Sequence, residues 1–206
     1  MIRARGGACV GWLNIDKPLT IIGESGFDPR DWARTGNPTL QAPDGAARAA
    51  TAHGGPAQAG DVALILHTSG TTSRPKIVPL SQRNLVASAT HIGRTLGFTA
   101  ADRGLNIMPL FHIHGLIAGV LAPLAAGSQV FCTPGFNALK FFSWMDEAHP
   151  TWYTAVPTMH QTILARAAQN REVIAAHPLR FLRSSSSSIP PQVIAELEAV
   201  FNAPLI

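Results

Sequence analysis

From residue 61 onward, short apolar runs alternate with longer segments in which apolar residues recur at helical spacing. The runs predict five strands, at residues 62–66, 105–110, 129–132, 152–156 and 179–183. The first should be a buried strand that leads into a loop. The segments between them predict helices at 84–96, 115–126, 138–148, 159–169 and 190–201. This alternation predicts an α/β fold, with a mostly parallel sheet that carries helices on both faces.

Residues 1–60 have a different character. Gly, Pro, Ala, Thr and Asp predominate there, and neither strand nor helix periodicity persists. Because such a segment buries little apolar surface, we expect a divergent, loose leader or linker at 1–60. Residues 61–206 should then form a partial domain.

Composition adds limits on the class of protein. With 206 residues, 46% of them hydrophobic, the chain can bury one sizeable core. Only 14% of residues are charged, which fits a fragment whose missing neighbours cover part of its surface. The net charge of +4 is scattered, and no run of Lys or Arg predicts a nucleic-acid partner.

The two cysteines predict the compartment. Cys9 and Cys132 are far apart and lack CxxC spacing, which is typical of a reduced, cytoplasmic protein. No apolar stretch near Met1 is long enough for a signal peptide. The most apolar segment, 115–126, is too short to span a bilayer, so no transmembrane segment is predicted.

The loop after the first predicted strand combines hydroxyls, a glycine and a lysine. Backbone amides on such a loop can form an anion-binding concavity, and the lysine ammonium adds charge, so a polyphosphate is the predicted ligand. A plain Ser/Thr-rich loop is the alternative. A Walker loop fails, because Pro75 stands where its second Gly should be and Ile77 where its Ser/Thr should be. The loop residues concerned are Thr68, Ser69, Gly70, Thr71, Thr72, Ser73 and Lys76.

Two histidines, His112 and His114, follow the second predicted strand. They would share a face if the segment were extended, so a metal pair competes with a role in lining a pocket. No nearby cluster of ligands completes a coordination shell, which favours the pocket. Residues 152–160 form a third notable segment, after the hydroxyl-rich loop and the two histidines. They have the pattern of a buried aromatic strand that ends at a proline turn. The fourth, Arg183 followed by five serines, is either a flexible linker or a functional loop.

The phosphate loop, T-S-G-T-T-S-R-P-K, resembles the signature of the adenylate-forming superfamily, which includes acyl-CoA synthetases, luciferases and peptide-synthetase adenylation domains. Ser73 in that loop, the segment F-H-I-H-G and the segment T-W-Y-T-A-V-P-T all resemble the oxalyl-CoA synthetase subgroup. Ile77 departs from the pattern, which has a glycine after the lysine. The resemblance covers residues 61–206, which would form a partial AMP-binding domain.

The resemblance implies an acid–thiol ligase that uses ATP, Mg²⁺ and coenzyme A to convert a carboxylic acid into an acyl-adenylate and then a thioester. It implies that the loop residues from Thr68 to Ser73, with Lys76, bind the ATP phosphates, and that Thr72 and Lys76 are catalytic. His112 would gate the entry of the carboxylic acid, and His114 would form part of the wall of the acid's pocket. If the acid is a small dicarboxylate such as oxalate, a protonated imidazole could pair with its second carboxylate. The adenine and acyl group would contact Ser185, Ser186 and Ser187.

The family's later motifs, including its metal-binding Glu and the catalytic Lys of its small C-terminal domain, have no counterpart in this sequence. We therefore expect the chain alone to be incomplete and inactive, with the remainder of its own domain as a missing partner. Two alternatives stay open. One is an inactive remnant with at most nucleotide binding, and the other is a metal-dependent enzyme that uses His112 and His114.

Overall fold

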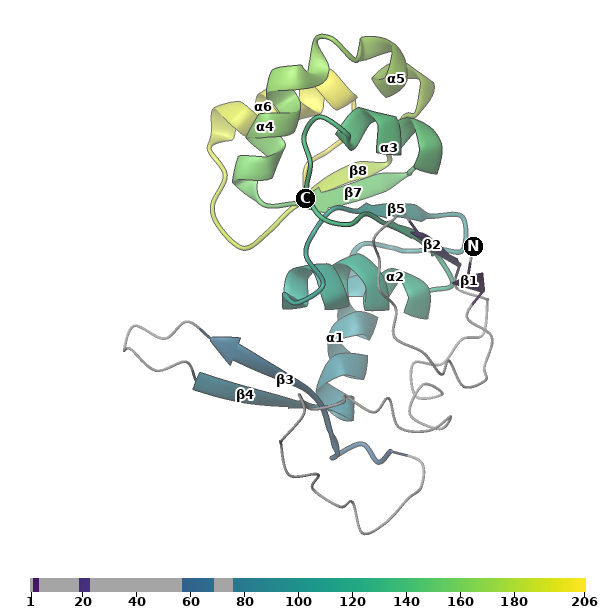
Figure 1. Cartoon of the computed structure of the whole chain (residues 1–206), viewed down its shortest axis with the longest axis vertical. Helices are drawn as coiled ribbons and strands as arrows, with labels where there is room; N and C mark the ends of the chain where they lie inside the picture. The colour runs from purple at the N-terminus through teal and green to yellow at the C-terminus, as the bar shows by residue number, and fades with distance from the viewer. Residues whose placement is uncertain (1, 4–18, 23–56, 69–75) are drawn as a thin grey trace.

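The computed structural model describes residues 2–3, 19–22, 57–68 and 76–206 (Figure 1). Its strands are β1 Ile2–Arg3, β2 Leu19–Ile22, β3 Val62–Thr68, β4 Lys76–Ser81, β5 Arg103–Asn106, β6 Gln129–Cys132, β7 Trp152–Ala155 and β8 Phe181–Ser184. Its helices are α1 Gln82–Thr95, the π-helix η2 His114–Leu121, α2 Ala122–Ala125, α3 Phe141–Ala148, α4 Pro157–Ala167, α5 Arg171–Ala176 and α6 Pro191–Phe201.

A six-stranded sheet in the order β1-β2-β6-β5-β7-β8 forms the centre of the described structure. Strands β6, β5, β7 and β8 are parallel, and β2 is antiparallel to β6. Helices α3 to α6 lie on one side of this sheet and α1 and α2 on the other (Figure 1). The predicted α/β fold, with a mostly parallel sheet and helices on both faces, is therefore confirmed.

Alternation along the strands divides the core into two layers. Tyr153 and Leu182 belong to the cluster that also contains the apolar side chains of α3, α4 and α6. Trp152 and Phe181, one residue earlier on each strand, pack with Phe98 on the α1 and α2 side. Successive side chains on a strand point to opposite faces, so residues two further along, 154 and 183, share the face of Trp152 and Phe181.

The first predicted strand has a different setting from the one expected. It forms β3, which pairs antiparallel with β4 in a separate two-stranded sheet (Figure 1). Val62 is 59% exposed and Ile65 54% exposed. A two-stranded hairpin buries at most one of its faces, here against α1. The prediction of a buried strand beside the parallel ones is therefore wrong.

Local side-chain chemistry explains two of the element boundaries. The strand predicted at 105–110 already ends at Asn106, whose amide accepts the backbone N–H of Met108 at 3.1 Å and donates to the carbonyl of Gly115 at 3.2 Å. These bonds turn the chain. Ser81 caps α1 in a reciprocal capping box with Asn84.

Besides strand β4, two features of the fold were not predicted. Helix α5 is only six residues long, too short for its periodicity to show. Strands β1 and β2 lie within the range 1–60 and join the sheet beside β6. The domain boundary at residue 60 stays a prediction.

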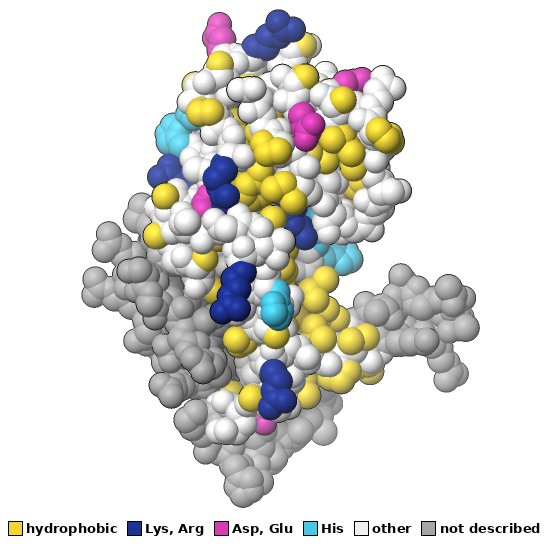
Figure 2. Space-filling view, turned by 180° about the vertical axis from the view of Figure 1, so that it is seen from behind, with side chains coloured by type: hydrophobic (Ala, Val, Ile, Leu, Met, Phe, Trp, Pro, Cys, Tyr) yellow, Lys and Arg dark blue, Asp and Glu magenta, His cyan; other side chains and the backbone are white. Residues whose placement is uncertain are grey.

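Two surface and helix features can be compared with the predictions made from composition. The basic side chains are scattered rather than gathered on the face that Figure 2 shows. None of the helices in the described ranges is long and apolar enough to cross a membrane.

Candidate functional site

The site is a partly buried polar cluster at the carboxyl ends of β7 and β8. His114, the first residue of the π-helix, is 8% exposed. Its Nε2 lies 2.6 Å from Oγ1 of Thr154, and its Nδ1 lies 3.1 Å from Oγ of Ser186. π-Helical turns are frequent at functional sites. Three segments that are far apart in sequence thus meet at the end of the sheet where ligands of parallel α/β folds collect.

Arg183 completes this cluster. Its Nη1 lies 3.1 Å from Nε2 of His114 and 3.2 Å from Oγ1 of Thr154. Thr154 and Arg183 are partners in the register of β7 and β8, so both side chains emerge on the same face. We call His114, Thr154, Arg183 and Ser186 the arginine cluster.

The chemistry of the guanidinium fixes the tautomer of His114. Arginine has only donors, so the Nε2 that it faces must be an acceptor. Nε2 therefore accepts from Arg183 and from the hydroxyl of Thr154, while the proton on Nδ1 is donated to Ser186. In this arrangement the imidazole of His114 is neutral.

Burial and charge act in the same direction on this imidazole. Burial, and next the Arg183 guanidinium, lower the pKa of His114 from 6.5 to about 4, with smaller contributions from His160 and His112. The hypothesis that a protonated His114 pairs with a second carboxylate is therefore not supported. The cation at this position is Arg183. Burial lowers the pKa of its guanidinium, but arginine stays charged at neutral pH.

A second buried histidine supports the cluster from the other face of the sheet. His160, on α4, donates from Nε2 to the carbonyl oxygen of Arg183 at 3.1 Å and accepts at Nδ1 from the Tyr153 hydroxyl at 3.0 Å. Burial lowers the pKa of His160 to about 4. The neutral imidazole thus joins α4 to the end of β8 and fixes the backbone of Arg183.

The two sequence-predicted histidines occupy different environments. The chain turns between Pro109 and His114 instead of staying extended, so His112 does not share the face of His114. His112 is exposed, and its ring lies 4.6 Å from that of Phe111, which is 76% exposed. Gly115 allows the turn to close, because a Cβ there would lie 2.4 Å from the carbonyl oxygen of Pro109.

The serine loop, residues 184–188, contacts the arginine cluster through one side chain. Ser186 contacts His114 and adopts a positive φ of 80°, whereas Ser185 bonds through its backbone N–H to the carbonyl of Ala155. Ser187 is exposed. Of the three predicted serines, Ser186 alone has a side-chain hydrogen bond to the cluster.

The predicted phosphate loop lies outside the described residues from Ser69 to Pro75. Its two ends, Thr68 and Lys76, are backbone partners in the β3–β4 ladder. The roles of Ser69, Gly70, Thr71, Thr72 and Ser73, and those of Thr68 and Lys76, stay predictions.

A metal site at the two predicted histidines has no support in the geometry. Both ring nitrogens of His114 are already engaged, one of them by a cation. No group of three or more His, Cys, Asp or Glu side chains in the described ranges is placed to hold a metal ion.

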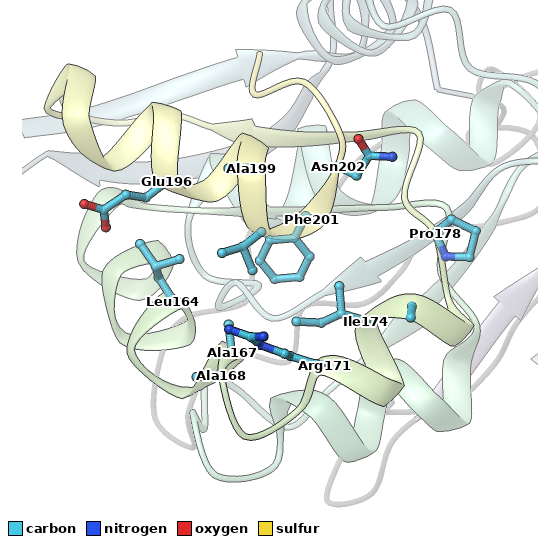
Figure 3. A pocket seen from close by; sticks show the side chains of 12 residues that line it. Leu164, Ala167, Ala168, Arg171, Ile174, Pro178, Glu196, Ala199, Phe201 and Asn202 are labelled. Atoms are coloured by element: carbon cyan, nitrogen blue, oxygen red, sulfur yellow. The ribbon is translucent and has the colours of Figure 1, made fainter.

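A hollow lies away from the arginine cluster, among α4, α5 and α6 (Figure 3). Its volume is about 780 Å³, and its lining is mostly apolar, with Arg171 and Glu196 among the lining residues. The side chains of this layer lie on the opposite face of the sheet from Thr154 and Arg183. This hollow is therefore separate from the site.

The sequence analysis missed the two polar strand residues of the site. Thr154 and Arg183 were predicted to lie in strands, but the face of the sheet on which each side chain lies was not predicted. The sequence does contain a signal for both residues. Thr154 comes two residues after Trp152, and Arg183 comes two residues after Phe181, each on a predicted strand, so each shares a face with an aromatic side chain. An arginine in that register must face a polar partner.

Comparison with known proteins places the chain in a family. Residues 18–206 match the AMP-binding enzyme family, and the chain belongs to it. Among its relatives are an oxalate–CoA ligase from Arabidopsis thaliana, 48% identical over 149 residues, and one from Saccharomyces cerevisiae, 40% identical over 151 residues. A sulfoacetate–CoA ligase from Cupriavidus necator is 40% identical over 153 residues. The resemblance to the oxalyl-CoA synthetase subgroup is thus confirmed.

The relatives are much longer than this chain. The matches cover 71–73% of the chain but only 27–29% of the length of these relatives. A solved malonyl-CoA ligase, in a complex with methylmalonyl-CoA and AMP, superposes with a TM-score of 0.65 at 29% identity, over 72% of this chain and 32% of that one. The fold described here therefore corresponds to about a third of a CoA ligase.

Proposed function

We propose that this chain supplies the acid-binding part of an ATP-dependent carboxylate–CoA ligase. The proposed substrate is a small acid with a second acidic group, such as oxalate. The acid would be activated as an acyl-adenylate and then transferred to coenzyme A. The observation that carries this proposal is the charge of Arg183 within the arginine cluster.

The guanidinium of Arg183 has no carboxylate partner among the described residues; its recorded contacts are to neutral His114 and Thr154. A partly buried cation is costly unless an anion balances it. Arginine also offers five donors in a fork that fits a carboxylate or sulfonate. These properties suit a substrate whose second acidic group supplies the missing negative charge.

The named substrates of the relatives share this chemistry. Oxalate, malonate and sulfoacetate each carry an acidic group besides the carboxylate that forms the thioester. A cation that recognises the second group would bind all three classes and disfavour acids with an apolar tail. This agreement supports Arg183 as the residue that selects the substrate.

His114, Thr154 and Ser186 would position the guanidinium rather than carry charge. Because His114 is neutral, it can accept from Nη1 without repelling it. The contact with Ser186 ties the serine loop to the same imidazole. His112, exposed on the turn, remains a proposed gate for the acid, and Ser185 and Ser187 remain proposed neighbours of the adenine or acyl group.

The loop from Thr68 to Lys76 would bind the triphosphate of ATP. Hydroxyls and amides of the loop would orient the phosphates, and Lys76 and Thr72 would stabilise charge as pyrophosphate leaves. Mg²⁺ would neutralise the phosphates when bound. No residue in the described part is assigned to that ion. The cytoplasmic location predicted from the cysteines is retained as part of this proposal.

A chimera tests the proposal. The aligned segment of the Arabidopsis thaliana oxalate–CoA ligase is replaced by the matching segment of this chain, which is 71% of its length, and thioester formation is measured with ATP, coenzyme A and oxalate. We expect oxalyl-CoA, and we expect little product from the 206-residue chain alone. A folded chimera that binds ATP without forming a thioester from oxalate, malonate or sulfoacetate would favour the inactive remnant instead.

A further inference from the structure

A second group of ionisable side chains lies outside the arginine cluster. Nδ1 of His149 and Nδ1 of His177 face each other at 3.0 Å, with ring centroids 4.5 Å apart. Nε2 of His177 lies 2.8 Å from Oδ1 of Asp146. None of these three residues has a role in the acid binding proposed for the arginine cluster.

The backbone holds both imidazoles in place. His149 ends α3 and His177 ends α5, and each donates its N–H to a carbonyl of its own helix. His149 has φ 46° and ψ 56°, a left-handed conformation in which Gly or Asn is the usual residue. The two helix ends therefore fix where the imidazoles lie.

The geometry points to a binding site for a divalent metal ion of the Zn²⁺ or Cu²⁺ type, with Nδ1 of His149 and Nδ1 of His177 as protein ligands. Two nitrogens on one tetrahedral zinc ion, at about 2.0–2.1 Å each, are roughly 3.3 Å apart. The observed 3.0 Å is within a few tenths of an ångström of that spacing. Water would complete the coordination.

Asp146 has the position of an outer-shell carboxylate. A metal-bound histidine commonly donates its other N–H to such a group, which fixes the tautomer and raises the basicity of the ligand. Because Nε2 of His177 donates to Asp146, its Nδ1 carries a lone pair. His149 supplies the second lone pair in the tautomer whose proton is on Nε2. Imidazole selects zinc or copper over magnesium or calcium.

Zinc titration of the 206-residue chain by calorimetry at neutral pH tests the site. We expect binding that weakens by about tenfold in Asp146→Ala and by more than that in His149→Gln and in His177→Gln. His91→Gln is the matched control, because His91 is exposed on α1, and it should bind as the parent does. Circular dichroism of each metal-free variant checks the fold.

Three results would overturn the site. One is an absence of zinc binding at millimolar concentration. Another is parental affinity in both histidine variants. The third is an equal loss in His91→Gln. Any of these would leave a simple hydrogen bond between His149 and His177. The outcome is independent of the proposed ligase function.

Discussion

Acidification should destabilise this fold through its two buried histidines. His114 and His160 each have a pKa of about 4 in the folded chain, against 6.5 when unfolded. Because folding lowers these pKa values, the unfolded state binds more protons as the pH falls from 6.5 toward 4. Stability is therefore complete above about pH 6.5 and is lost as the pH falls through that window. The pKa difference corresponds to on the order of 3 kcal/mol for each imidazole.

Urea unfolding, followed by the fluorescence of the buried Trp144 and Trp152, measures this effect. Between pH 6 and pH 5 the free energy of unfolding should fall by about 1 kcal/mol per imidazole. His160→Gln should remove about half of that dependence, and His91→Gln provides an exposed control. If the pH dependence of His160→Gln matches that of the parent chain, the assignment of His160 as a buried neutral group is wrong.

Three further substitutions test the packing beside the site, one helix cap and one buried carboxylate. Gly115→Ala should lower the free energy of unfolding by about 2 kcal/mol or more, because the new Cβ meets the carbonyl of Pro109; a value within 0.5 kcal/mol would contradict the close approach. Ser81→Ala should cost about 1 kcal/mol through loss of the capping box, with helix content by circular dichroism as a second readout. Asp102→Ala should cost about 2 kcal/mol or more, because it leaves Arg180 and both the backbone N–H and the hydroxyl of Thr99 without their acceptor, and unchanged urea denaturation would refute this.

Strands could be predicted most accurately where a short apolar run is buried by the sheet, as in β6 and β7. Residues 129–132 were predicted with the observed bounds, and β7 differs by one residue. The β3–β4 hairpin could not be placed in the same way. The run from Val62 to Leu66 is as apolar as the buried strands, and β4 contains Pro79, a residue that argues against a strand.

The site was predicted in outline but not in its charge. The sequence patterns identified His114, after the second predicted strand, and the serines that follow the strand predicted at 179–183. The charge state of His114 depends on burial and on a guanidinium 69 residues away, which no local pattern encodes. The choice of Arg183 over His114 as the cation required the register of β7 against β8.

Substitution of Arg183 in the active chimera tests the central claim most directly. The measurement is kcat/KM for oxalate and for acetate, which lacks the second acidic group, in the parent chimera and in Arg183→Met. We predict a loss of about 100-fold for oxalate, in the range for removing one partner of a buried charge pair, and a loss of only a few fold for acetate. Equal losses for the two acids, or no loss for oxalate, would contradict the role of Arg183.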